Sequence, residues 1–118
     1  MLREKRQLPS YPDGVLGIYK AKPRKTDFGA KKNIERREDM EFIASLCFNV
    51  QTIRDQDYEF AERKSFKLSL KVKTPRFDLV ESDNLALIGD TLFDISHIDT
   101  TKNEMYLYLE EVRTIDLE

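Results

Sequence analysis

The chain has 118 residues, of which 36% are charged and 40% are apolar, with one cysteine and one histidine. This length supports a single hydrophobic core, and the scarcity of cysteine and histidine excludes a disulfide framework, a multi-cysteine zinc site and most histidine-based metal sites. No apolar run approaches the roughly 20 residues of a transmembrane helix. We therefore expect a soluble intracellular protein that is not an enzyme and needs no cofactor.

Charge is distributed unevenly along the chain. Residues 1–39 contain 11 Lys and Arg against 6 Asp and Glu, a net charge of +5. Residues 40–76 contain 7 against 5, a net +2, and residues 77–118 contain 2 against 11, a net −9. Three explanations stay open: two solvated faces, a basic front that binds nucleic acid, or contact between the front and back of neighbouring copies, which closes a ring if the rotation permits.

The first half of the chain contains two segments with a period of two. Residues 15–21 read as a strand that follows the turn residues Pro12-Asp13-Gly14. Residues 42–50 predict a second strand. Its apolar side would carry Phe42, Ala44, Leu46, Phe48 and Val50, with Cys47 on the other side.

The second half continues the alternation. Residues 66–73, FKLSLKVK, predict a half-buried strand that Pro75 terminates. Residues 85–88 and 91–98 predict a hairpin around Gly89-Asp90, with the glycine supplying a positive φ. A longer turn over residues 99–103 leads to the final strand, in which Met105, Leu107 and Leu109 alternate with tyrosines.

Two segments interrupt this pattern. Residues 22–39 are dense in charge and predict a charged hairpin loop, whereas residues 51–65 predict a long loop or a short helix. The sequence as a whole predicts a mainly β protein, a small antiparallel barrel of about six strands, because closure removes exposed edges. We expect a flexible arm at residues 1–11, one domain at 12–113 and a short tail at 114–118.

The residues with reactive side chains do not form a catalytic pattern. A catalytic thiol at Cys47 needs a nearby base, and only His97 could supply it; we expect a free, inert cysteine and a histidine that packs or bonds locally. Carboxylates gather in the interrupting segment, but no calcium-loop glycine follows them, so we expect no metal site. They are Asp55, Asp57, Glu59 and Glu62.

A basic strand face is the strongest sign of an alternative function. Lys67, Lys71 and Lys73 lie on one side of the strand predicted over residues 66–73. A barrel with a basic groove and aromatic residues is typical of single-stranded nucleic-acid binding. The acidic residues Glu110 and Glu111 follow the tyrosines of the last strand, however, and weaken a stacking platform, so a solvated, lysine-rich face explains the pattern better.

The order of these motifs resembles the head–tail joining proteins of long-tailed phages, the small adaptor and stopper family. The residues that carry the resemblance are Ile88, Gly89, Phe93, Ile95 and the run from Glu110 to Arg113. Upstream, KTDFGAKKN is similar to that family's polar turn after the first strand. FNVQTIRDQDYEFAERKSFKLSLKVK is similar to its strand, long loop and following strand. The resemblance covers roughly residues 12–113.

The resemblance implies a structural virion protein without enzymatic activity. Such a protein forms a ring in the neck of the virion, beneath the portal or adaptor protein and above a tail-end protein, after assembly in the bacterial cytoplasm. Phage DNA passes through the ring, which helps to retain the packaged genome. By position, the loop over residues 51–65 would project into the channel. Its candidate lumen residues are Arg54, Asp55, Asp57, Tyr58, Glu59, Arg63 and Lys64.

Overall fold

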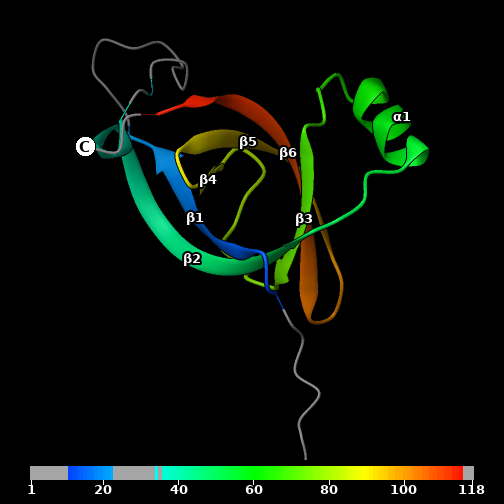
Figure 1. Cartoon of the computed structure of the whole chain (residues 1–118), viewed down its shortest axis with the longest axis horizontal. Coiled ribbons are helices and arrows are strands. Elements are labelled where there is room, and N and C mark those ends of the chain that lie inside the picture. Colours follow the sequence, from blue (N-terminus) through cyan, green and yellow to red (C-terminus); the bar gives the residue numbers. More distant parts are fainter. Residues whose placement is uncertain (1–10, 23–33, 35, 116–118) are drawn as a thin grey trace, which may run out of the picture.

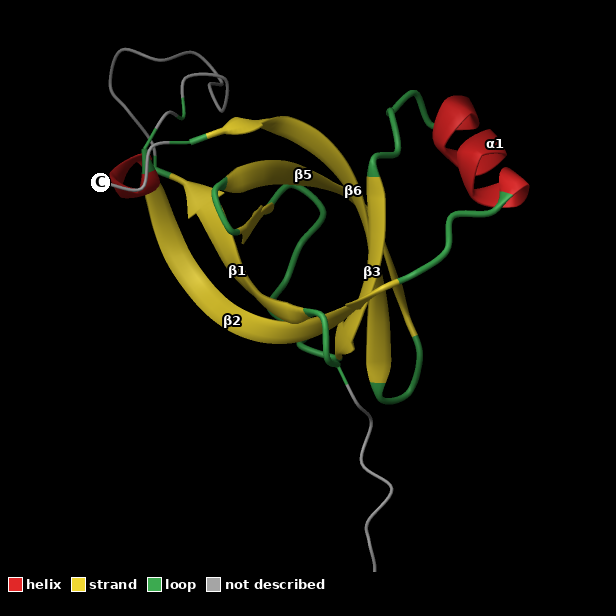
Figure 2. Cartoon of the chain, in the orientation of Figure 1, coloured by secondary structure: helices red, strands yellow, loops and turns green. Residues whose placement is uncertain are grey.

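The computed structural model describes residues 11–22, 34 and 36–115, and its architecture is a closed barrel of six antiparallel strands (Figure 1). The first three strands are β1 (Gly14–Ala21), β2 (Met40–Val50) and β3 (Leu70–Pro75). The last three are β4 (Leu85–Ile88), β5 (Thr91–Thr100) and β6 (Glu104–Thr114). A short 3₁₀ helix (Arg37–Asp39) precedes β2, and one α-helix, α1 (Asp55–Arg63), lies between β2 and β3 (Figure 2). The mainly β fold with a short helix is thus confirmed.

The strands follow one another around the barrel in the order β1-β2-β3-β6-β5-β4, and β4 pairs with β1 to close the sheet. The alternate residues that face inward form the main core, and several of them are completely buried. Its fully buried members include Leu16, Ile18, Val72, Ala86 and Leu107. Burial of these side chains is the principal stabilisation of the fold.

The tight turns have the backbone geometry that their sequences predict. Gly89 has a φ of +62° between β4 and β5, and a Cβ there would meet no atom within 4 Å. Backbone conformation rather than crowding therefore favours glycine at this position. At the start of β1, the carboxylate of Asp13 accepts a hydrogen bond of 2.7 Å from the N–H of Val50. This bond ties the turn before β1 to the end of β2.

A β-bulge makes the inward-facing residues of β2 differ from those predicted for the second strand. The pairing of β1 with β2 shifts between Ile18 and Tyr19, which pairs with Phe42. Phe42 therefore leaves the inward-facing set and contacts the ring of Tyr19 on the outside, with 57% of its surface exposed. Val50 is also exposed, at 48%. The prediction that Phe42 and Val50 share a buried face with Phe48 is wrong. For Phe42 the reason is the bulge, because one extra residue in a strand reverses the alternation. Val50 lies on the other side of the bulge, as the last residue of β2, and is exposed at the strand end.

The third strand begins later than predicted. The sequence predicts a strand over residues 66–73, but β3 spans Leu70–Pro75. Phe66 and Leu68 pack with the helix segment outside the barrel, in a cluster with Ala61 and Tyr108. Their alternation with polar residues reflects this second packing surface, and Pro75 is the last residue of the strand rather than a residue beyond it.

A smaller apolar cluster covers the outside of β1, β4 and β5. Tyr19, Leu85 and Leu92 face outward here and are buried beneath Ile34, Met40 and Ile115. The charged hairpin loop predicted over residues 22–39 lies mostly outside the described residues, as do residues 1–10 of the predicted arm and 116–118 of the tail. Among the described helices, none has the length and apolar character needed to cross a membrane.

Candidate functional site

The candidate site is the segment that leaves the barrel between β2 and β3 and contains α1. Both helix ends have local hydrogen bonds. The carboxylate of Asp57 accepts from the N–H of Arg54, at 3.0 Å, before the first turn. At the other end Ser65 has a φ of +66°, and the N–H of Phe66 donates to the carbonyl of Ala61 at 3.0 Å. Carboxylates in the first turn and Arg63 in the last also complement the helix dipole.

The first turn of α1 is attached to β3 by an ion pair. The ammonium of Lys71 lies 3.1 Å from a carboxylate oxygen of Asp57, and both side chains are about 15% exposed. The same ammonium lies over the rings of Tyr106 and Tyr108, at 5.7 and 5.2 Å from their centroids. Burial alone would raise the pKa of Asp57, but the hydrogen bond from Arg54 and the charge of Lys71 outweigh it and lower that pKa.

The middle of α1 packs on the barrel through one aromatic residue. The ring of Phe60 contacts His97 of β5 and Tyr108 of β6, with centroids 4.6 and 5.9 Å apart. Ala61 is buried on the same side, against Leu68 and Tyr108. These contacts hold α1 outside the barrel, beside β3 and β6 (Figure 1).

Asp99 connects the aromatic contact to a hydrogen-bond network. It accepts a hydrogen bond of 3.1 Å from the hydroxyl of Tyr108, and its other oxygen lies 2.9 Å from Nε2 of His97. Burial, together with the nearby carboxylate of Asp99, raises the pKa of the Tyr108 hydroxyl well above its usual range. Tyr108 is therefore a neutral donor throughout the physiological pH range.

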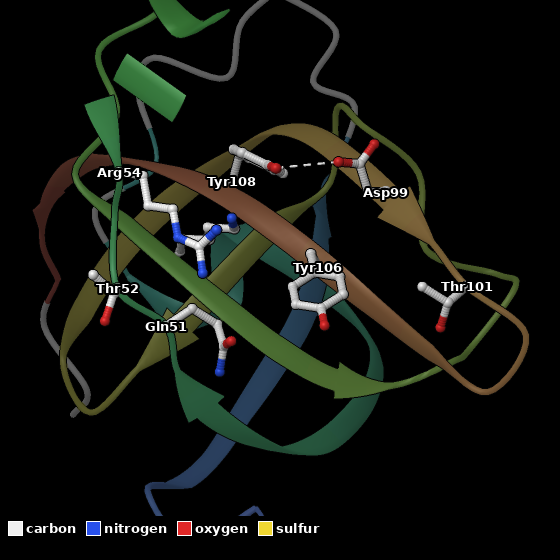
Figure 3. Close-up of a pocket in the computed structure, with 8 residues that line it drawn as sticks. Gln51, Thr52, Arg54, Asp99, Thr101, Tyr106 and Tyr108 are labelled. Atoms are coloured by element: carbon white, nitrogen blue, oxygen red, sulfur yellow. Dashed lines mark hydrogen bonds between the residues drawn. The ribbon is translucent and has the colours of Figure 1, made fainter. Parts of the chain in front are cut away.

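A pocket of about 450 Å³ lies between the start of this segment and the outer face of the barrel. Figure 3 shows residues of the segment on one side and residues of β5, β6 and their connecting turn on the other. The lining combines two cations, one carboxylate and several neutral polar groups. It consists of Gln51, Thr52, Arg54, Lys71, Asp99, Thr101, Tyr106 and Tyr108.

Of the seven candidate lumen residues, three contact a neighbouring side chain or line the pocket, and four face solvent on the helix. Asp57 faces the barrel, and the ammonium of Lys64 lies 5.9 Å from the ring centroid of Phe60. Arg54 is exposed and lines the pocket. The remaining four are exposed on the helix and face away from these contacts: Asp55, Tyr58, Glu59 and Arg63.

The candidate basic face is dispersed and largely paired. Lys67 lies before β3 and is exposed, whereas Lys71 is paired with Asp57. Lys73 is half-buried and lies 3.7 Å from a carboxylate oxygen of Glu104 on β6. Only one of the three lysines is therefore a freely exposed charge.

Sequence reasoning did not single out Phe60, Asp99 and Tyr108 as a group, although they hold the helix in place. A second β-bulge, between Ile95 and His97, explains part of this. It turns His97 out of the inward-facing set of Phe93 and Ile95 and toward Tyr108. The prediction that His97 packs or bonds locally is confirmed, because it contacts Phe60 and its Nε2 lies within hydrogen-bond distance of Asp99, two residues away.

Two further observations concern reactive groups. Cys47 is a free, exposed cysteine on the outside of β2. Within the described part of the chain, no group of three or more His, Cys, Asp or Glu is arranged to hold a metal ion. Neither observation provides a catalytic centre.

Comparison with protein families and with curated proteins gives no relative. No family model matches the chain, and no curated protein matches it significantly. The function must therefore be argued from the residues and their geometry.

Proposed function

We propose that this protein is a structural component of a phage virion, a head–tail connector or stopper that acts as a ring below the portal. The observation that carries the proposal is the helical segment between β2 and β3. It connects two strands of a closed six-stranded barrel, lies outside the barrel, and presents a charged outer face to solvent. A rigid barrel with one such projecting element fits the expected connector, in which strands form the ring wall and the long segment reaches the channel.

The charge of the projecting face suits a channel for DNA. Asp55, Glu59 and Glu62 are exposed on α1, and Arg54, Arg63 and Lys64 are exposed at its two ends. A surface whose cations are matched by carboxylates has no net positive charge, so it releases few counterions from the phosphate backbone and binds it weakly. DNA would thus slide past the helix rather than adhere to it.

The described contacts favour this function over nucleic-acid binding. A binding face needs several free cations along one surface, whereas Lys71 and Lys73 are each paired with a carboxylate. Tyr106 and Tyr108 are covered in part by Lys71 and, for Tyr108, by Phe60, so they offer no open stacking platform. An oligonucleotide titration tests the point: a connector shows little affinity for free oligonucleotide, and a binder shows an affinity that falls steeply with salt.

The uneven charge of the chain supports assembly through opposite ends. The +5 of residues 1–39 and the −9 of residues 77–118 would attract each other in neighbouring copies, or would face different partners at the two ends of the ring. Such pairing contributes more to orientation and association rate than to affinity. Ring formation or docking should therefore weaken as salt rises, and assembly that is independent of salt would contradict this part of the proposal.

The first test is deletion of the gene from the phage that encodes it. We expect negative-stain electron microscopy of the lysate to show separate tails beside heads that are empty or leaking DNA. Complementation with the wild-type gene should restore joined particles. Intact virions with normal tails would remove the protein from the neck.

A second test addresses the channel helix. Replacement of residues 54–62 by a Gly-Ser turn should give particles that retain less DNA. For a variant that keeps the helix, Glu59→Lys with Glu62→Lys should slow DNA release, because a basic surface binds phosphate. Glu38→Lys with Glu41→Lys, before and at the start of β2, makes the same change in net charge away from the helix and from the acidic last part of the chain, and should leave release unchanged. Equal DNA retention and release in all variants would exclude a gating role for α1.

A further inference from the structure

The second strand has a long stretch of edge that no described residue pairs. β2 pairs with β1 from Met40 to Phe48, but its other edge pairs with β3 only at Asn49 and Val50. We call the stretch Phe42–Cys47 the open edge. It lies on the outer rim of the barrel wall in Figure 1, where β2 has left β3.

The register explains why the pairing stops. Asn49 lies opposite Lys73, so continuing the ladder would place Cys47 opposite Pro75. Proline has no N–H, and β3 ends there. Successive residues of β2 direct their backbone groups alternately to the two sides. Phe48 accepts from Asp13 on the β1 side, whereas the N–H of Gln51 donates to Lys71 on the β3 side. The N–H and C=O groups of Ser45 and Cys47 therefore point away from β1, into the open edge.

The open edge lacks the features that usually protect strand edges. Proteins place charged residues or prolines on exposed edges to prevent pairing with other chains. Beyond its ladder with β3, the edge of β6 carries Glu110, Glu111 and Arg113, and the N–H of Glu111 donates to the hydroxyl of Ser69 at 3.0 Å. Beyond its ladder with β4, the edge of β5 carries His97 and Asp99. The open edge, with sequence FIASLC, has neither a charge nor a proline. Its composition is that of a segment that pairs readily in a sheet.

We propose that the open edge of β2 is an interaction surface for a second copy of this chain, through antiparallel pairing of β2 with β2 across a twofold axis. Such a contact is self-complementary, because each copy offers the same strand. Ser45 and Cys47 of each copy supply the backbone donors and acceptors. The barrel walls of the two copies become one continuous sheet.

Charge favours a second copy over the other free edges of the chain. Pairing β2 with itself places an uncharged stretch against an uncharged stretch, and leaves Glu41 at the outer ends of the contact. Pairing with the free edge of β5 or β6 would bring the charged residues of those edges beside exposed Phe42. The inference concerns the free protein and does not depend on the proposed function.

The test compares the wild-type protein with edge variants over a concentration series, by size-exclusion chromatography with light scattering. We expect the wild type to reach twice the monomer mass. Ser45→Pro removes a donor on the open edge without removing a bond to β1, and Ser45→Lys adds a charge while keeping the donor. Both should stay monomeric, with circular dichroism confirming that they are folded; Ser45→Lys tests the proposal even if the proline variant does not fold.

A matched control distinguishes the edge from the neighbouring apolar face. Val15 is 59% exposed on β1, one strand further from the open edge. Val15→Lys should therefore dimerise like the wild type. Loss of the dimer in Val15→Lys, its persistence in Ser45→Lys, or a monomeric wild type at every concentration would overturn the proposal. A wild type that stays monomeric would indicate that the open edge pairs with a strand of a different protein.

Amide hydrogen exchange provides an independent readout. The amides of Ser45 and Cys47 should exchange more slowly as the concentration rises, because they are bonded only in the dimer. The Leu46 amide, which faces β1, should be protected at all concentrations. Rapid exchange at Ser45 and Cys47 in a solution that contains dimer would show that the copies meet elsewhere and would overturn the proposal.

Discussion

The barrel and the helix beside it are stabilised by different interactions. In the barrel, each of the six strands pairs with a neighbour on both sides, and the core contains fully buried aliphatic side chains. α1 contacts the barrel through an ion pair, one aromatic ring and a small apolar cluster, on the outside of the sheet. The first kind of packing gives cooperative unfolding, whereas the second permits local release. We therefore expect a rigid wall with a helix attachment that opens at a lower free energy than the barrel needs to unfold.

The largest effect is expected in the barrel core. Leu107 is completely buried in β6, so Leu107→Ala should lower the free energy of unfolding of the whole domain by about 2–5 kcal/mol. Denaturant unfolding followed by circular dichroism measures this change. Leu79→Ala, at a residue that is 70% exposed, should change it by less than about 0.5 kcal/mol. Similar losses in both variants would show that the barrel core is not the main source of stability.

A smaller and local effect is expected at Phe60. Phe60→Ala removes the ring that packs on His97 and Tyr108 and should destabilise the helix attachment by about 1–2 kcal/mol. Hydrogen exchange should rise in α1 while the amides of β5 and β6 remain protected. Tyr58→Ala, on the exposed side of the same helix, is the control. If Phe60→Ala accelerated exchange in the strands as much as in α1, the helix would be part of the barrel's cooperative unit.

The strands of the barrel could be predicted from the sequence because the alternation of apolar and polar residues is a local pattern. Alternating residues from Glu104 to Leu109 and the glycine turn at Gly89 determine strands and turn without help from the rest of the chain. The displaced strand start at Leu70 was not predictable in this way. Phe66 and Leu68 alternate like strand residues, yet they pack against α1, and a period of two does not indicate which partner an apolar side chain meets.

The candidate site was predictable only as a segment. The sequence identified residues 51–65 and their charges, but not which residues face the barrel. Phe60, His97, Asp99 and Tyr108 come from three elements, and two of them meet only because a bulge after Ile95 turns His97 outward. No glycine marks the bulge after Ile95. The bulge that turns Phe42 outward has a weak signal in Gly17, a glycine inside β1 on which the ring of Tyr19 packs, since a Cβ there would lie 2.7 Å from that ring.

The ion pair between Asp57 and Lys71 should contribute less than Phe60. Asp57→Asn should weaken the helix attachment by about 1 kcal/mol, because the pair is only partly exposed and its hydrogen bonds are charge-assisted. A double-mutant cycle with Lys71→Met isolates the coupling between the two residues. Glu59→Gln, on the exposed face, is the matched control. Additive effects of the two substitutions would show that the pair contributes nothing of its own.

Acidic pH should weaken the ion pair between Asp57 and Lys71. The pKa of Asp57 is lower in the folded protein than the value of about 3.9 in an unfolded chain. Its contribution is therefore complete above that value and is lost as the pH falls through the folded pKa. Exchange of the α1 amides should increase over this range in the wild type, after correction for intrinsic rates. In Asp57→Asn the increase should be smaller; an equal increase would assign it to other carboxylates.

Alkaline pH should weaken both the helix attachment and the barrel, and each effect should depend on a different tyrosine. Burial and a hydrogen bond to Glu104 raise the pKa of Tyr11 to about 12, and burial with Asp99 raises that of Tyr108 further. Because both folded pKa values exceed the value of about 10 of an unfolded tyrosine, their contributions are complete below pH 10 and decline above it. Tyr108→Phe should reduce the decline measured in α1, and Tyr11→Phe should reduce the decline measured near Glu104 on β6. If each variant changed both regions equally, helix and barrel would respond to pH as one unit, and the distinction between a rigid wall and a releasable helix would fail.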